Sequence, residues 1–385
     1  SLKYYLERGS EMRARILFRA CLYSVLFFCL MVILTGFSNP QENKLDLIRA
    51  AIKEKGAQWT PKETPLTRLS VEQLRKMMGD RSREFTGQEP IVPRLTDSIP
   101  ESIDWRNIEG HKYVTSIKDQ TSECGSCVAF DAVATLESLI CIEEERPGED
   151  FDLYEMDLFM CGGGSCSYGW DNGSACVRML NFGIPDEYCW PYVPEDTSCD
   201  QSCSNKTLRD VQIGSAYFIM GQTFYMQAVS IAPIMTTMAV FEDFVSHGDG
   251  IYEHAWGDFV GWHSICIIGY NTEGQTPYWI VKNSWGEDWG VYGFARIKMG
   301  ECGIEGGGFW ISGVTLPPAP TAPTDLNASS VSGYVRLDWE DNSDNEMIFE
   351  LERKEGAGAF ITIAEIAASS SSYVDTEVDP ETSYS

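Results

Sequence analysis

A short run around Cys127 is the part of the chain best suited to covalent chemistry. It reads Cys124-Gly125-Ser126-Cys127, and the apolar residues after it recur at helical spacing. This pattern predicts a helix whose first turn contains Cys127. Unpaired backbone N–H groups and the helix dipole favour the thiolate there, and the thiolate is the form of cysteine that attacks carbon. The local sequence leaves one alternative open, in which Cys127 is half of a disulfide bond.

Histidine and asparagine residues that could activate Cys127 are separated by their context. The four histidines are His111, His247, His254 and His263. His263 directly precedes the apolar residues 264–270, which predict a strand that would hold the imidazole rigidly. His254 lies in a loop-like stretch and is interpreted as a surface residue. Asn283 stands beside tryptophans, where a buried amide needs a partner such as an imidazole N–H, although a turn residue is the alternative.

Charge is distributed unevenly along the 385 residues, which carry a formal net charge of −28. Residues 1–98 contain 16 Lys and Arg against 11 Asp and Glu, a charge of +5, whereas residues 99–385 carry −33. A body this acidic repels phosphate backbones and anionic membranes, which argues against nucleic-acid binding. The opposite charges favour a basic leader that docks on an acidic body.

Cysteine is abundant, with 13 residues, of which 11 lie between Cys124 and Cys302. The crowded group between residues 161 and 203 predicts a lobe held by disulfide bonds and formed in an oxidising compartment. The Cys124/Cys127 pair lacks the second pair of cysteines or histidines that a zinc site needs. We therefore expect neither a metal nor a cofactor.

The N-terminal segment predicts export. A basic stretch that begins at Met12 precedes the almost wholly apolar residues 21–37, which is the pattern of a secretory signal peptide. The apolar stretch is close to membrane-spanning length, so a membrane anchor is the alternative for residues 1–37. The expected location is secreted or extracytoplasmic.

Residues 38–98, called the leader below, are expected to be a short propeptide. Helical spacing predicts helices over residues 42–56 and 70–78, separated by a proline-bearing loop at Trp59. Such helices bury little surface alone, so we expect them to dock on the main body as an intramolecular inhibitor; a flexible linker is the alternative. The connector at residues 88–100 contains three prolines and would suit proteolytic removal.

Residues 99–315 form the main domain, with a helical first half and a stranded second half, which predicts an α+β body. Residues 151–203 are rich in glycine, cysteine and turns and predict an irregular lobe. Strands are expected at residues 231–241, 263–270, 278–282, 293–297 and 309–314.

The C-terminal part is expected to be a separate module. Residues 316–323 contain four prolines and predict a stiff linker. Residues 324–385 alternate apolar and polar side chains around Trp339, and their order resembles a fibronectin type III domain. About sixty residues are fewer than the roughly 100 of such sandwiches. We therefore expect a partial all-β sandwich, which could contact a cell surface, a polysaccharide or a protein.

Several sequence blocks, taken in order, resemble the papain/cathepsin family of cysteine peptidases. They are Gln120 with Cys124-Gly125-Ser126-Cys127, Cys166 with Gly169, His263 before its strand, Lys282-Asn283-Ser284-Trp285-Gly286, and Trp289-Gly290. The resemblance covers residues 99–314 and implies a papain-like two-lobe fold, with one helical and one β-barrel-like lobe. The cleft between the lobes would hold Cys127 on one wall and His263 on the other.

The resemblance also implies catalytic roles. Cys127 would be the nucleophile, His263 its proton acceptor and donor, and Asn283 the residue that orients His263. Gln120 and the backbone N–H of Cys127 would bind the oxyanion. Two tryptophans would shield the triad: Trp285 and Trp289.

Disulfide bonds and a substrate cleft follow from the same resemblance. The family pattern pairs Cys124 with Cys166 and Cys161 with Cys199. It assigns no partner to Cys176, Cys189 or Cys203, while Cys141 and Cys266 are interpreted as core thiols. The residues expected to bind substrate are Gly169, Trp170, Tyr168, Gly307 and Trp262. No charged residue is expected in the pocket at Trp170 and Gly307, which favours an apolar or aromatic substrate side chain.

Three departures from the family pattern concern the catalytic cleft. Val128 stands where the family usually has tryptophan after the nucleophile. One extra residue separates Gln120 from Cys127, which affects where the Gln120 amide points. Of the glycine pair that the family has after Cys166, only Gly169 is kept, and Tyr168 would narrow the cleft.

These observations predict a secreted cysteine endopeptidase that is made as a zymogen and cleaves protein or peptide substrates. Two alternatives stay open at the level of sequence. One is a catalytically degenerate papain-like scaffold that binds or adheres through its C-terminal module. The other is an acyl transferase that uses the same triad.

Overall fold

The computed structural model describes residues 40–84, 99–189, 191–331, 333–379 and 382–385. The predicted signal or anchor at residues 1–37 and most of the proline-bearing connector lie outside these ranges. None of the helices in the described ranges is both long and apolar enough to span a bilayer.

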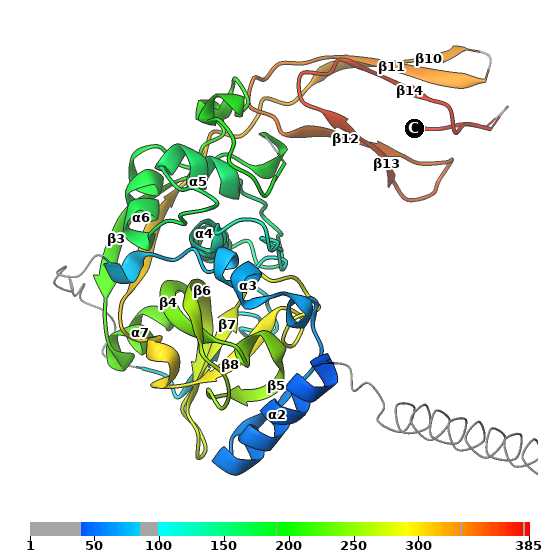
Figure 1. The fold of residues 1–385 in the computed structure, drawn as a ribbon. Helices are drawn as coiled ribbons and strands as arrows, with labels where there is room; N and C mark the ends of the chain where they lie inside the picture. Colours follow the sequence, from blue (N-terminus) through cyan, green and yellow to red (C-terminus); the bar gives the residue numbers. More distant parts are fainter. Residues whose placement is uncertain (1–39, 85–98, 190, 332, 380–381) are drawn as a thin grey trace, which may run out of the picture.

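Three helices form one part of the main body (Figure 1). They are α4 (Cys127–Glu143), α5 (Glu155–Gly162) and α6 (Asn172–Asn181). The predicted helix that begins at Cys127 is confirmed, and it is buried on nearly all sides. The prediction of an irregular lobe is wrong for α5 and α6. Both helices are short and pack with α4, and tertiary packing rather than intrinsic propensity stabilises such helices.

A nine-stranded sheet forms the other part of the body. Its strands are β1 (Gln58–Pro61), β2 (Ser102–Asp104), β3 (Gln212–Ile219), β4 (Ile234–Phe241), β5 (His247–Tyr252), β6 (Phe259–Asn271), β7 (Tyr278–Lys282), β8 (Phe294–Lys298) and β9 (Gly308–Thr315). The order is β1-β5-β8-β7-β6-β4-β9-β3, with β2 beside β6. All five predicted strands are confirmed, while the short helix α7 (Gln222–Val229) between β3 and β4 was not anticipated.

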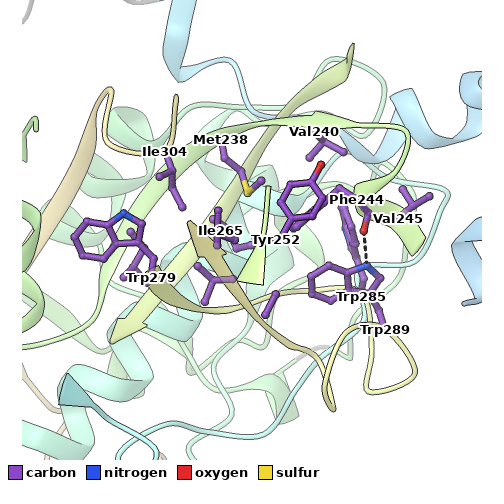
Figure 2. Close-up of a cluster of buried hydrophobic side chains, with 14 of the residues drawn as sticks. Met238, Val240, Phe244, Val245, Tyr252, Ile265, Trp279, Trp285, Trp289 and Ile304 are labelled. Carbon is purple, nitrogen blue, oxygen red and sulfur yellow. Dashed lines mark hydrogen bonds between the residues drawn. The ribbon is translucent and has the colours of Figure 1, made fainter. Parts of the chain in front are cut away.

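Two separate hydrophobic cores correspond to these two parts. The first lies in the sheet region and is aromatic, with Trp285 and Trp289 buried beside Phe244 and Trp279 at the other end of the cluster (Figure 2). The second lies between α4, α5, α6 and the strands β3 and β9. Strand β6 lies against α4, so the two cores meet where the helix of Cys127 contacts the strand of His263.

The leader packs on the body through helix α2 (Pro40–Lys55), strand β1 and helix α3 (Val71–Met77). Helix α2 lies beside β5, and α3 lies where the helices meet the sheet (Figure 1). Both predicted helices are present. The predicted loop at Trp59 is wrong, because residues 58–61 pair with β5 as an antiparallel edge strand. The Trp59 ring is buried there and its Nε1 donates to the Glu253 carbonyl at 3.0 Å.

The C-terminal residues form two small β-sheets. Strands β10 (Thr324–Val331), β11 (Tyr334–Glu340) and β14 (Ser372–Asp375) form one, and β12 (Ile348–Arg353) and β13 (Ile361–Ala367) form the other. Trp339 and Phe349 pack across the two sheets, with ring centroids 5.4 Å apart. The arrangement is an all-β addition that extends from the helical end of the body (Figure 1).

Candidate active site

Cys127 is the first residue of α4 and is fully buried with a free thiol. The loop before it is fixed by a disulfide bond between Cys124 and Cys166 and by a hydrogen bond from Gly125 N to Cys166 O at 2.9 Å. The alternative of a disulfide within the Cys-Gly-Ser-Cys run therefore does not apply. The thiol stands at a helix start, where backbone N–H groups favour a negative charge.

His263 lies on β6 beside that helix and is held by Asn283, which directly follows β7. His263 Nε2 and Asn283 Oδ1 are 2.8 Å apart, and Oδ1 also accepts from Ser284 N at 2.9 Å. The backbone N–H of Ser264 hydrogen bonds to the Cys127 sulfur, so the residue next to His263 touches the thiol. The Trp285 ring lies 4.7 Å from the His263 ring, and Trp289 packs behind Trp285.

Gln120 reaches the same site although one extra residue precedes Cys127. The loop absorbs that residue through a left-handed turn at Thr121, with φ of 62°, whose N–H donates to Asp119 Oδ1. Gln120 is fully buried, and its Oε1 accepts from Ser284 Oγ at 2.7 Å. Its Nε2 donates to the carbonyls of Cys124 and Met77. The amide donor therefore points at a leader carbonyl.

The leader crosses the site directly over Cys127. The Gly79 N–H donates to the Met77 carbonyl at 3.0 Å and also faces the Cys127 sulfur, and the Gly79 carbonyl accepts from Trp170 N at 2.8 Å. Arg81 N donates in turn to the Trp170 carbonyl, so Asp80 pairs with Trp170 as a parallel bridge. Docking of the leader was expected from the sequence, but the contact at Gly79 was not. A glycine after a helix is commonly part of the helix C-terminal cap, so its position gave no sign of a second role.

Burial under the leader shifts the pKa values of the Cys127 thiol and the His263 imidazole. Desolvation, with a smaller effect of the Asp80 carboxylate, raises the pKa of the Cys127 thiol to about 12. Desolvation also lowers the pKa of His263 to about 4, although the hydrogen bond to Asn283 acts in the opposite direction. Loss of solvent disfavours the charged form of each group. In the covered state the Cys127 thiol and the His263 imidazole are therefore both neutral, and His263 Nδ1 has no hydrogen-bond partner in the described residues.

The residues expected to bind substrate lie along the path of the leader. Gly169 and Trp170 face it through their backbones, whereas the Trp170 ring packs against Phe159. Tyr168 is exposed, with the Arg81 guanidinium over its ring at 5.2 Å. The Trp262 carbonyl accepts from Asp80 N at 3.3 Å. Backbone contacts of this kind can bind a chain of almost any sequence.

Gly307 lines a groove of about 910 Å³ next to this path. Thr237, Phe218 and Phe309 also line it, and so do the charged side chains of Asp171 and Arg178. The expectation that no charge lies around Gly307 is therefore wrong. The leader residue Arg83 covers part of the groove, where its guanidinium donates to the Gly303, Gly306 and Thr237 carbonyls.

Two further disulfide bonds hold the loops beyond α5. Cys161 pairs with Cys199, as the resemblance implied, and Cys189 pairs with Cys203, two residues to which the family pattern assigned no partner. Cys166 of the crowded group pairs with Cys124 and Cys176 is free, and the remaining four cysteines allow three connectivities, so sequence alone does not single out one of them. Four other cysteines in the described ranges are free besides Cys127: Cys141, Cys176, Cys266 and Cys302.

Comparisons with known proteins identify a family that shares this sequence and fold. Residues 99–309 match the profile described as "Papain family cysteine protease". A "Gut-specific cysteine proteinase" of Caenorhabditis elegans is 33% identical over 250 residues, covering 57% of this chain and 74% of the relative. A "Cathepsin B-like cysteine proteinase" of Schistosoma japonicum is 31% identical over 279 residues, covering 61% and 81%.

Solved structures of precursors share the fold. A recombinant stem bromelain precursor superposes with a TM-score of 0.59 at 25% identity, covering 75% of this chain and 98% of that one. The proCathepsin B S9 from Trypanosoma congolense gives a TM-score of 0.61 at 23% identity, covering 70% and 97%. The predicted α+β two-lobe fold is confirmed by these neighbours.

Proposed function

Because the chain belongs to the papain family of cysteine proteases, we propose that it is a secreted endopeptidase with a Cys127–His263–Asn283 triad, made as a zymogen. The observation that carries this proposal is the site itself. A free thiol at the start of α4 contacts the residue after His263, and His263 is hydrogen bonded to Asn283. The Gln120 amide beside them supports catalysis over a degenerate binding scaffold.

The chemistry requires the covered pair to become charged. When solvent returns to the cleft, the proton of Cys127 passes to His263, and the thiolate attacks the carbonyl carbon of the scissile bond. The imidazolium then gives its proton to the leaving amine, and an acyl-enzyme remains. His263 takes a proton from water, which attacks the acyl carbon and releases Cys127. Gln120 Nε2 and the Cys127 N–H would stabilise the oxyanion in both steps.

The leader is proposed to inhibit by occupying the groups that this chemistry needs. Met77 O accepts from the Gln120 amide, the Gly79 N–H faces the Cys127 sulfur, and the backbone of Trp170 pairs with the leader at Asp80. We assign residues 38–98 to this propeptide, 99–315 to the peptidase domain, 316–323 to a linker and 324–385 to a fibronectin-like contact module. Residues 1–37 are assigned to a signal or anchor.

Secretion is supported by the three disulfide bonds in the described part of the body. Disulfide bonds persist in oxidising compartments and are rare in reducing ones. Expression with the natural N-terminus, followed by analysis of medium, membrane and cell lysate, would distinguish a cleaved signal from an anchor.

Covalent labelling tests the proposed nucleophile. After removal of the leader, a peptidyl epoxide that reacts with thiols should modify Cys127 in preference to Cys141, Cys176, Cys266 and Cys302, because among these five thiols Cys127 lies at the start of a helix and contacts the residue after His263. Mass spectrometry of the digested protein identifies the modified residue. Labelling spread over several cysteines, or no labelling, would instead favour the degenerate scaffold. Aminolysis of an acyl substrate in the same samples tests the acyl-transfer alternative.

The leader interface contains a histidine that should make docking sensitive to pH. His247 is fully buried against Trp59 of the leader and the rings of Phe244, Tyr252 and Trp289, and neither ring nitrogen has a hydrogen-bond partner in the described residues. Burial lowers the pKa of His247 from 6.5 to about 3. Asp249 opposes this shift, whereas Arg296 and Lys62 add to it.

The direction of the pH effect follows from the different pKa values of His247 in the docked and undocked states. A histidine whose pKa is lowered by docking leaves docking unaffected above pH 6.5 and weakens it progressively as the pH falls toward 3. Phe244, Tyr252 and Trp289 of the body also bury His247, so the loss at pH 5 relative to neutral pH has an upper limit of about 30-fold, reached if the leader causes the whole shift. Asp80 acts in the opposite sense, because burial raises the pKa of its carboxyl and acid therefore favours docking.

His247→Phe isolates this effect, since Asp80 is present in both proteins. In full-length chains that also carry Cys127→Ala, the rate at which an added protease cuts the leader is measured at pH 7.5 and pH 5. The ratio of the rate in the chain that keeps His247 to the rate in the His247→Phe variant should rise on acidification, by at most about 30-fold. An equal ratio at both pH values would contradict the prediction.

A further inference from the structure

A buried carboxyl group connects the helix of Cys127 to the strand of His263. Asp131 lies one turn after Cys127 on α4 and is 4% exposed. Its Oδ2 lies 2.6 Å from the hydroxyl of Ser264, the residue after His263. An acidic side chain is rarely buried in a protein interior unless it is paired or hydrogen bonded. The sequence pattern alone did not single out Asp131.

Two buried polar atoms, one on Asp131 and one on Asn283, have no hydrogen-bond partner in the described residues. Asp131 Oδ1 and Asn283 Nδ2 are both buried and make no hydrogen bond to any of the described residues. Both residues line one small cavity of about 20 Å³, together with Ser264, Ser284, Lys118 and Lys282. A cavity that has room for one water molecule and several polar atoms in its wall is the kind that holds an ordered water.

Other groups around this cavity are already engaged. The Lys118 ammonium donates to Glu137, to Glu155 and to the Leu153 carbonyl. Lys282 donates to Thr115 Oγ1 at 2.8 Å. An unpaired buried donor or acceptor costs stability, so Asp131 Oδ1 and Asn283 Nδ2 are the atoms that gain most from a shared water.

We propose that Asp131 is a positioning residue for the triad, acting through one water in this cavity. Asn283 Nδ2 donates to the water, and the water donates to Asp131 Oδ1. This fixes the Asn283 carboxamide with Oδ1 toward His263. A flipped carboxamide would set its N–H₂ against the imidazole N–H, donor against donor. The inference rests on the proposed function, because it gives Asn283 the task of holding His263.

The contacts of the Ser264 hydroxyl are those expected if Asp131 is a neutral acid. The single hydroxyl proton of Ser264 faces Asp131 Oδ2 and, at 3.0 Å, Asn172 Oδ1. If Asp131 is protonated, it donates to Ser264, which donates on to Asn172. Burial raises the pKa of Asp131 well above its ordinary value, which agrees with this arrangement.

The test compares two replacements that differ in hydrogen bonding. Asparagine keeps a donor for Ser264 and an acceptor for the water, so Asp131→Asn should retain kcat within about threefold. Leucine keeps the approximate size and loses both, so Asp131→Leu should lower kcat about tenfold with KM nearly unchanged, the effect of one lost hydrogen bond. Ser138→Ala is the matched control, because Ser138 is buried on the same helix and its hydroxyl donates to the Ala134 carbonyl at 2.8 Å.

A double-mutant cycle separates this role from a general loss of packing. In an Asn283→Ala background, Asp131→Leu should cause no further loss of kcat. The same tenfold loss in both backgrounds, or full activity of Asp131→Leu alone, would overturn the inference. An Asn283→Ala enzyme with normal kcat would instead refute the proposed triad. Thermal unfolding checks each variant, and Asp131→Ala replaces the leucine variant if leucine prevents folding.

Discussion

Cys127→Ala is expected to abolish peptide hydrolysis, with a fall in kcat of at least about a thousandfold. Without the sulfur no acyl-enzyme can form, and the remaining groups can only polarise the carbonyl of a bound peptide. His263→Ala should cause a loss of similar size, because a thiol with no neighbouring base stays protonated near neutral pH. Both rates are measured on fluorogenic peptides after an added protease has removed the leader.

The matched control for this prediction is Cys141→Ala. Cys141 is a free, buried thiol on the same helix, and its sulfur lies 3.5 Å from the Glu149 carbonyl. Its replacement should leave kcat within about twofold of the parent while it lowers stability slightly. Equal loss in both variants would mean that alanine harms α4 in general. Residual activity above about one per cent in a folded Cys127→Ala protein would refute the proposed nucleophile.

The features that could be predicted from the sequence are those that a short stretch of residues determines. The apolar residues after Cys127 indicated the helix start, and the bounds of β7 match the predicted residues 278–282. Cys127, His263 and Asn283 are joined by contacts between α4, β6 and β7. Alternating and helical periodicities report such elements because each buries one face.

The features that sequence reasoning missed depend on contacts between distant segments. Helices α5 and α6 lie in glycine-rich and cysteine-rich sequence, so packing on α4 rather than propensity stabilises them. Strand β1 forms because the exposed edge of β5 accepts residues 58–61. The proposed roles of His247 and Asp131 follow from buried polar atoms that have no hydrogen-bond partner in the described residues, which no single-sequence pattern reports. Such groups become visible only when every buried polar atom is accounted for.

Gly79→Val is expected to release the active site without any change to the peptidase domain. A side chain at Gly79 would place its Cβ 1.8 Å from the Gly125 carbonyl oxygen. On the other side, the Gly79 carbonyl already lies where a side chain on Gly169 would be. Backbone atoms on both sides cannot rotate away, so the leader must lift from Cys127. A strain of about 3 kcal/mol corresponds to about a hundredfold loss of docking.

The measurement is the rate at which the thiol-directed epoxide labels the intact full-length chain at pH 7.5. This rate is proportional to the fraction of molecules whose leader is lifted, so it should rise about a hundredfold in Gly79→Val. Arg75→Ala is the control, because Arg75 is exposed on α3 and its removal creates no clash. Ionic strength is held constant, since leader and body are oppositely charged. An unchanged labelling rate would show that the fit of Gly79 between Gly125 and Gly169 does not hold the zymogen closed. Inhibition would then have to depend on the strand of Trp59 and on the two leader helices.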